Sequence, residues 1–294
     1  MKLIHKVEDC VVYKGSKNDS YVLKIPSSLE LLQGIKDGEI IKHVKRSDNN
    51  NNNNNNNNGL KFKAKRVESL KQFIEKMHDN NEMRDKDMDG LIYTLVLKML
   101  ADVGVLLQYC MMKYNKVIPF FSLEDIIVIE NEDENEVNDD ARESGPSASR
   151  FDFVFINGEK MLEMGGAGAS AGVGTDDEDD DDQNEDNDDN DDECNNGGSS
   201  VLRVDVPLQV NKQTSFLPLE LAENELKHLP IKLTTTSWLY SLSSLCIYAL
   251  LKYKFKNGED DIKRIGRPFL HTSLYFCLKR CMKTNPEKRV LLYV

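Results

Sequence analysis

The sequence predicts an α+β fold in which a small β-rich N-terminal lobe precedes a mainly helical C-terminal lobe. Two runs rich in β-branched and aromatic residues, at 7–14 and 21–25, flank the turn sequence Gly15-Ser-Lys-Asn-Asp19 and predict a β-hairpin closed by Pro26. Beyond residue 88 most apolar residues recur at helical spacing. We therefore expect one domain over residues 1–294, with the β-rich lobe at 1–66 and the helical lobe at 67–294.

Further elements follow from local patterns in the same way. Residues 29–45 and 69–77 have apolar positions at helical spacing, although Gly34 and Gly38 weaken the first helix. Residues 60–64 can form another strand. Two short apolar runs, 126–129 and 151–156, flank an acidic segment and predict two strands of a hairpin with a long connecting loop.

Three low-complexity segments interrupt the foldable sequence: an asparagine-rich segment at 48–59, an acidic one at 130–149 and a glycine-rich, acidic one at 165–200. Such segments bury too little apolar surface to offset the entropy of ordering, so we expect them to be disordered. Residues 176–193 hold 14 acidic and no basic residues, and residues 130–143 hold 8 acidic residues and one Arg. Setting these two runs aside changes the net charge from −12 to +9, so the foldable part is basic.

The spacing of the cysteines and the hydropathy of residues 91–112 indicate where in the cell the protein is expected. The 6 cysteines are scattered without CxxC spacing, which predicts reduced thiols in an intracellular protein, cytoplasmic or nuclear. Residues 91–112 are long enough to cross a bilayer, but Lys98, Asp102 and Gln108 give the predicted helix a polar side. We therefore expect no membrane partner.

The last third of the chain carries three motifs in a recognisable order. Phe216-Leu-Pro-Leu-Glu220 is followed by a strongly apolar helical segment at 237–251 and then by Lys283-Thr-Asn-Pro-Glu-Lys-Arg289. Together these resemble the end of the activation segment, the central helix and the closing turn of a protein-kinase C-lobe. The resemblance implies a two-lobed kinase-like fold over nearly the whole chain and a structural ion pair between Glu220 and Arg289.

The same resemblance implies a nucleotide site in the N-terminal lobe. Tyr21-Val-Leu-Lys24-Ile resembles the kinase strand whose lysine holds the phosphates of ATP, and its glutamate partner would be Glu39, with Glu30 as the alternative. A lone lysine in a hairpin can equally be a solvated charge. The segment at 7–13, where a glycine-rich loop would cover the phosphates, contains no glycine.

Most catalytic positions of a kinase are altered. In the loop Pro119-Phe-Phe121-Ser-Leu-Glu-Asp125-Ile126, Phe121 stands where the resemblance places the catalytic base and Ile126 where it places a metal-binding Asn. Glu124 and Asp125 are the nearby carboxylates, although a loop acid that caps the next strand or faces water is the simpler interpretation.

The metal-binding Asp-Phe-Gly motif has two possible registers. One is Asp152-Phe-Val, which would keep a metal ligand at Asp152. The other is Ile156-Asn-Gly158, which would remove that ligand. We favour the second, because residues 151–156 alternate as a strand and Gly158 then begins a turn.

These observations predict a catalytically impaired pseudokinase that acts by binding a protein partner. ATP is the cofactor that the resemblance implies, whereas the altered positions argue against Mg²⁺. The first alternative is an active atypical serine/threonine kinase that uses Asp152 for the metal and Glu124 or Asp125 as base. The second is an interaction scaffold in which residues 176–193 engage a basic partner.

The lysines and arginines are dispersed apart from those at 61–66, so nucleic-acid binding is not expected.

Overall fold

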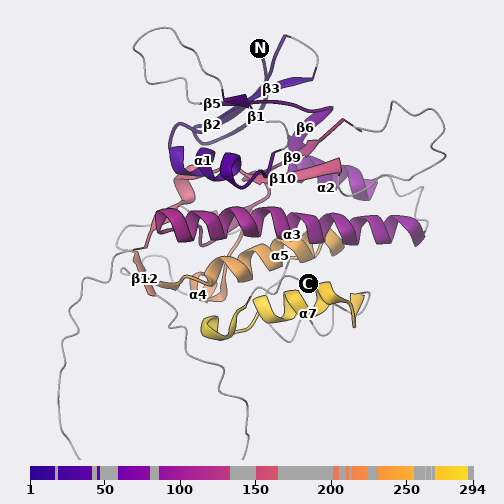
Figure 1. Ribbon diagram of the computed structural model, residues 1–294. Coiled ribbons are helices and arrows are strands. Elements are labelled where there is room, and N and C mark those ends of the chain that lie inside the picture. The colour runs from indigo at the N-terminus through magenta and orange to yellow at the C-terminus, as the bar shows by residue number, and fades with distance from the viewer. Residues whose placement is uncertain are drawn as a thin grey trace, which may run out of the picture.

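The computed structural model describes residues 1–16, 19–41, 45–46, 59–79, 86–132, 150–164, 201–204, 210–211, 214–223, 231–254, 262, 266 and 269–290. The fold is mixed α/β, with antiparallel sheets and helices, and it places a sheet layer above a helical layer (Figure 1). Most of the three segments predicted to be disordered lies outside the described residues. The predicted segments 48–59 and 130–149 each include one residue too many, because Gly59 and Glu130 belong to strands.

The N-terminal sheet has five antiparallel strands in the order β1-β2-β3-β5-β4. The strands are β1 (Lys2–Val7), β2 (Cys10–Lys14), β3 (Ser20–Lys24), β4 (Lys45–Arg46) and β5 (Gly59–Lys63). Directly opposite residues of an antiparallel pair share a face. The row formed by Val12, Leu23 and Leu60 is almost completely buried and marks the inner face of the sheet. The opposite face, called the outer face below, carries Val11, Lys24 and Gly59.

The first helix, α1 (Leu29–Asp37), is shorter than the sequence suggested. Its first turn is capped by Ser28, whose hydroxyl accepts a hydrogen bond from the Leu31 N–H at 3.1 Å. The helix ends at Gly38, and Glu39 then adopts a left-handed conformation with φ of 49°. An interior glycine, Gly34, lets α1 pack closely against the long helix α3 (Lys86–Tyr114).

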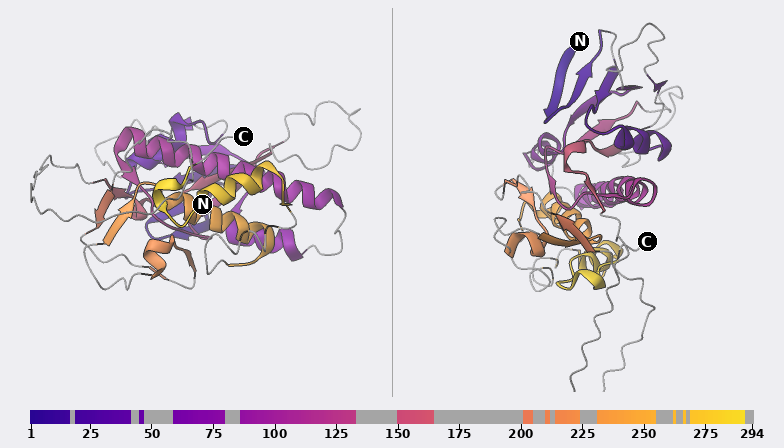
Figure 2. Two further views of the ribbon diagram at one scale, coloured as in Figure 1. Left: turned by 90° about the horizontal axis from the view of Figure 1, so that it is seen from below. Right: turned by 90° about the vertical axis from the view of Figure 1, so that its left-hand side faces the viewer.

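The helix α3 forms the centre of the molecule. It contacts α1, the strand β10 (Phe151–Phe155) and the helix α5 (Ser237–Leu251), so it lies between the sheet layer and the remaining helices (Figure 2). Residues Gly90–Tyr114 are long and apolar enough to cross a membrane by length and composition alone. Of the most apolar window, 44% is buried inside the fold, and a core helix can pass the same test, so the helix is weak evidence for a membrane span.

A second sheet connects the two layers. Its order is β10-β9-β6, with β6 (Arg66–Ser69) and β9 (Ile126–Glu130), and the helix α2 (Leu70–Asp79) follows β6 directly. The β9–β10 hairpin was predicted from the two apolar runs. All ten residues of its strands are buried, because the hairpin lies against α3 and against α2.

Short elements complete the part of the chain that the structure describes. Three two-stranded pairs join distant segments: β7 (Lys116–Val117) with β11 (Leu162–Glu163), β8 (Phe121–Ser122) with β13 (Ser215–Phe216), and β12 (Val201–Val204) with β14 (Ile231–Thr234). The helical elements are the 3₁₀ turn η3 (Gly158–Lys160), α4 (Leu219–Glu223), α7 (Ser273–Cys281) and the 3₁₀ turn η5 (Pro286–Lys288). Five of the cysteines are buried free thiols, and Cys194 lies outside the described residues.

The contact between α1 and α3 gives a test of this packing. A Cβ at Gly34 would lie 3.0 Å from Leu106 Cδ1, whereas nothing lies within 4 Å of a Cβ at Gly90. We expect Gly34→Val to lower the free energy of unfolding by about 1–3 kcal/mol through overpacking. The control Gly90→Ala, at an exposed position of α3, should raise the free energy of unfolding by about 0.5–1 kcal/mol. Urea denaturation measures the free energy of unfolding of both variants. Equal changes in Gly34→Val and Gly90→Ala would contradict the close packing of α1 against α3.

Candidate functional site

The candidate site is a buried polar junction built around the carboxylate of Asp125. This residue is 1% exposed and stands between the short strand β8 and β9. Its Oδ2 accepts hydrogen bonds from the Ser122 N–H at 2.7 Å and from Lys160 Nζ at 2.5 Å, and its Oδ1 accepts one from Asn157 Nδ2 at 2.8 Å. The loop after β8 and the segment after β10 therefore meet at one buried charge.

Backbone hydrogen bonds and burial hold the partners of Asp125 in place. The Ile156 N–H donates to the Asp125 carbonyl at 2.8 Å, which continues the β9–β10 ladder by one step and brings Asn157 to the carboxylate. One turn of 3₁₀ helix, η3, then directs Lys160 back towards Asp125. The Lys160 side chain is only 17% exposed, and its ammonium lies 4.7 Å from the centre of the Phe120 ring.

The junction also contacts the start of α1. A Cβ at Gly158 would lie 2.7 Å from Ser28 Cβ and 2.8 Å from Ser27 Oγ, so only glycine fits there. Ser28, which caps α1, also donates to Met161 Sδ at 3.3 Å. The segment 157–161 thus links the helix of the sheet layer to the loops of the helical layer.

A second ion pair links α1 to the helical layer. Glu30 pairs with Lys116 at 3.1 Å, just beyond the end of α3. A backbone hydrogen bond at Glu30 and the neighbouring Lys116 lower the pKa of the Glu30 carboxyl, against a smaller opposing effect of burial. Glu30 was the alternative partner predicted for Lys24, and the structure gives it a different lysine.

The chemistry of the junction is that of an internally neutralised carboxylate. A carboxylate has about four lone-pair positions, and three donors, one of them a cation, already point at Asp125. Among the described residues, no group of three or more His, Cys, Asp or Glu side chains could hold a metal ion. The Lys160 ammonium therefore supplies the positive charge that a buried carboxylate requires.

The predicted base and metal positions lie in the apolar core. The Phe121 side chain is completely buried, and its ring stands edge-on to Phe155 at 5.6 Å between ring centres. Ile126 is the first residue of β9 and is also completely buried. Glu124 is 43% exposed and pairs with the half-exposed Lys71 at 3.5 Å. Phe121 and Ile126 are apolar and Glu124 is exposed, so Asp125 is the one buried carboxylate among the described residues of this loop.

The structure does not bring Lys24 to this junction. His5, which shares the inner face with Val12, reaches the loop through a hydrogen bond between its Nε2 and the Glu124 carbonyl at 2.8 Å. The inner face therefore points at the junction, and Lys24, on the outer face, points away from it. Glu39 is exposed beyond the end of α1, and within the described part of the chain no ion pair joins it to Lys24.

Asp152 occupies a separate polar cluster. It accepts a hydrogen bond from Asn131 Nδ2 at 2.8 Å and lies 3.4 Å from Lys98 Nζ, while Lys98 also contacts Asp102 at 2.8 Å. Burial raises the pKa of Asp102, and Lys98 opposes this shift. Asp152 pairs with Ile129 in the hairpin, four residues along β9 from Asp125, which places the two backbones roughly 13 Å apart. The strand β10 includes Asp152 and ends at Phe155, and a 3₁₀ turn begins at Gly158, so the strand and turn expected for residues 151–158 are confirmed.

The predicted contact between Glu220 and Arg289 is present. Arg289 donates to both carboxylate oxygens, from Nη1 to Oε1 at 2.6 Å and from Nη2 to Oε2 at 2.8 Å. Its side chain is completely buried, and Nε also donates to the Lys283 carbonyl at 2.8 Å. Ser237 at the start of α5 donates to Glu220 at 2.8 Å, so the pair connects α4, α5 and the closing turn.

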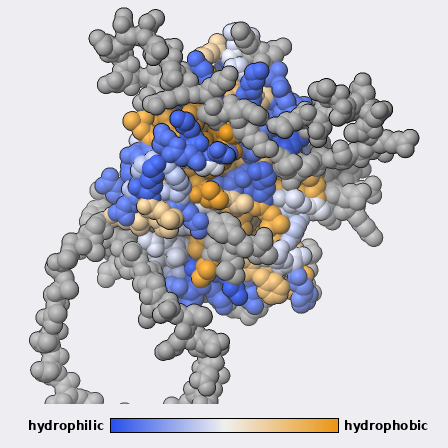
Figure 3. Space-filling view, viewed as in Figure 1, coloured by the Kyte–Doolittle hydropathy of each residue, from blue (hydrophilic) through white to orange (hydrophobic). Residues whose placement is uncertain are grey.

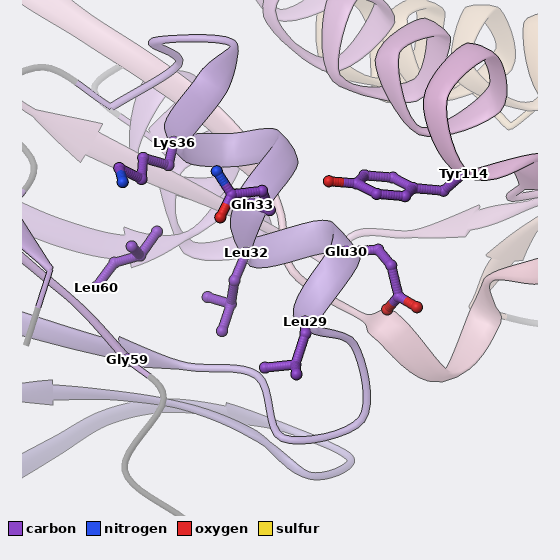
Figure 4. Close-up of a pocket in the computed structure, with 8 residues that line it drawn as sticks. All are labelled: Leu29, Glu30, Leu32, Gln33, Lys36, Gly59, Leu60 and Tyr114. Atoms are coloured by element: carbon purple, nitrogen blue, oxygen red, sulfur yellow. The ribbon is translucent and has the colours of Figure 1, made fainter. Parts of the chain in front are cut away.

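An open cavity of about 330 Å³ lies outside the junction, along α1. Leu29, Leu32 and Leu60 line it with apolar side chains, and its polar lining residues are Glu30, Gln33, Lys36 and Tyr114 (Figure 4). Hydrophobic residues are visible beside α1 in the space-filling view (Figure 3). The cavity contains none of the residues proposed from the sequence except Glu30.

Several residues of the site could not be found from the sequence. Lys160 and Asn157 lie more than thirty residues from Asp125, and Lys98 and Asp102 looked like the polar side of a surface helix. The one local feature of the sequence that could have indicated Lys160 as a partner of Asp125 is its position two residues after Gly158, and a lysine at that spacing is not characteristic of any known site. No protein-family model matches the chain, and comparison with curated proteins gives no match.

The junction gives a direct stability test. Lys160→Met keeps the length of the side chain but leaves the buried Asp125 carboxylate uncompensated, so we expect a loss of about 3–5 kcal/mol in the free energy of unfolding. The matched control Lys71→Met removes an exposed ion pair and should cost less than about 0.5 kcal/mol. Urea denaturation at neutral pH distinguishes the two, and a small effect of Lys160→Met would show that the contact is not compensating a buried charge.

The Glu220–Arg289 pair predicts a pH dependence. Burial alone would raise the pKa of Glu220, but the hydrogen bonds and charge of Arg289 outweigh it and hold the pKa below the ordinary value of 4.5. The pair therefore stabilises the fold fully above pH 4.5, and this contribution is lost as the pH falls through the lowered pKa. We expect Glu220→Gln to be destabilising at pH 7 and less so at pH 3.5, measured by urea denaturation. A difference that grew on acidification would contradict this sign.

Proposed function

We propose that this chain is a kinase-like, two-lobed domain that has lost phosphoryl transfer and works by binding a protein partner. The observation that carries the proposal is the junction itself, where the resemblance to kinases places the catalytic loop and the metal ligands. There Phe121 and Ile126 are core residues, and Lys160 neutralises the buried Asp125. Phosphoryl transfer depends on positioning and on metal-ion neutralisation of phosphate charge, which this junction does not provide.

Two features support the kinase-like part of the proposal. The sheet layer with α1 stands above a helical layer with α3 and α5, in the order of elements that the resemblance implies (Figure 1). The bidentate contact between Arg289 and Glu220 spans 69 residues and was expected from the closing-turn motif. An unrelated helical fold would have no reason to join these two positions.

The alternative of an active atypical kinase requires convergent carboxylates. Asp152 would have to hold a metal beside Glu124 or Asp125. The hairpin register instead separates Asp152 from Asp125 by roughly 13 Å, and each carboxylate has its own lysine partner. The outward position of Lys24 also argues against a phosphate contact through that side chain.

The scaffold alternative concerns residues 176–193, which lie outside the described residues, and it stays a prediction.

Nucleotide titration and a transfer assay test the proposal together. We expect incubation with labelled ATP and Mg²⁺ or Mn²⁺ to give no transfer to the chain or to a generic protein substrate. A thermal-shift titration with ATP, with and without Mg²⁺, should show no increase in stability that depends on the metal, because ligand binding to the native state must raise it. Label transfer that Asp125→Asn abolishes and Glu124→Gln does not would overturn the proposal and support an active enzyme.

A further inference from the structure

The outer face of the five-stranded sheet gathers lysines that are scattered along the sequence. In the antiparallel ladders, Lys6 lies opposite Val11, Val11 opposite Lys24, and Lys24 opposite Gly59, so these residues form one row across the sheet. The next row contains Leu3, Tyr13, Val22 and Lys61, and the row beyond it contains Ser20 and Lys63. These ten residues come from four strands, and four of them are lysines, while the fifth strand, β4, places Lys45 opposite Lys61.

The charge on this outer face is of one sign. None of the residues in the three rows is acidic. Lys6, Lys61 and Lys63 are exposed, Lys24 is partly exposed, and none of the four forms an ion pair with another residue in the described ranges. Lysines two strands apart in one row are about 10 Å apart, a distance comparable to the Debye length at physiological salt, so their charges repel one another. A polyanion on this face would remove that repulsion.

The spacing favours an extended acidic polypeptide as the occupant. Lys61 and Lys63 alternate on β5, so their side chains repeat every ~6.8 Å, which equals the repeat of side chains on one side of an extended peptide. Carboxylates at alternate positions of such a peptide can meet successive lysines. Leu3, which is 50% exposed, and the half-buried Tyr13 supply apolar contacts in the row that contains Lys61.

The same face is less suited to nucleic acid. It has no arginine, whose planar fork matches phosphate groups, among the described side chains of the three rows. Binding of single strands also uses aromatic rings on which bases stack, and the sole aromatic residue here, Tyr13, is half-buried within the row.

We propose that the outer face, through Lys6, Lys24, Lys61 and Lys63, is a docking surface for an Asp/Glu-rich segment of a partner protein. It lies on the side of the sheet opposite the Asp125 junction, so this interaction is independent of nucleotide chemistry.

Fluorescence anisotropy with the full chain tests this surface. The probe is a labelled peptide with the sequence of residues 176–193, which holds 14 acidic residues, and the control peptide has every Asp and Glu replaced by Asn and Gln. We expect the acidic peptide to bind at 50 mM salt, the control peptide not to bind, and affinity to fall as salt rises. The titration is repeated on a chain whose own residues 176–193 carry the same Asn and Gln replacements, so that competition within the chain does not hide binding.

Charge-reversal variants locate the site. Lys61→Glu with Lys63→Glu should weaken peptide binding by at least about tenfold. The matched control, Arg280→Glu with Lys288→Glu, reverses two exposed charges in the helical layer and should change the affinity less than about twofold. Equal losses in both pairs, or no peptide binding by either form of the chain, would overturn the proposal. Tighter binding of a single-stranded oligonucleotide, lost in the same outer-face variant, would replace it with nucleic-acid recognition.

Discussion

The carboxylate of Asp125 imposes a strict requirement on the rest of the fold. A charge removed from water must be neutralised and hydrogen-bonded, or the native state becomes unstable. Asp125 meets this requirement with one backbone N–H, one amide and the ammonium of Lys160. Because these donors come from two segments separated by the β9–β10 hairpin, satisfying the charge fixes the position of both segments. The position of the loop after β8 relative to the segment after β10 follows from that constraint.

The constraint extends from the junction to both layers. Gly158 can approach Ser28 closely only because Lys160 and Asn157 hold its segment against Asp125, and Ser28 in turn caps α1. His5 reaches the same loop from the inner face of the sheet. The Glu220–Arg289 pair plays the corresponding part at the other end, where it joins α4, α5 and the closing turn. These two ion pairs thus connect the main parts of a fold in which the expected catalytic positions Phe121 and Ile126 are apolar.

Local patterns in the sequence predicted much of this architecture. Apolar residues recur at regular spacing in the strands and helices that were predicted correctly, namely the β2–β3 hairpin, β9, β10, α3 and α5. The pairing of Glu220 with Arg289 was predicted from the two motifs that contain these residues. The extent of α1 was overestimated, because apolar spacing continued past Gly38 while the backbone turned at Glu39. The face of the sheet on which Lys24 lies depends on strand register. The pairing of Asp125 with Lys160 depends on the folding of segments that are distant in the sequence. Neither property is encoded in a short window of sequence.

Binding of Mn²⁺ tests the central claim most directly. Electron paramagnetic resonance of Mn²⁺, with and without ATP, measures how much of the metal is held by the protein. If Lys160 already neutralises Asp125, the wild-type chain should leave the spectrum of free Mn²⁺ or of Mn²⁺–ATP unchanged. About one protein-bound Mn²⁺ per chain, lost in Asp125→Asn, would contradict the account, because it would show that the junction accepts a metal ion in place of its own lysine.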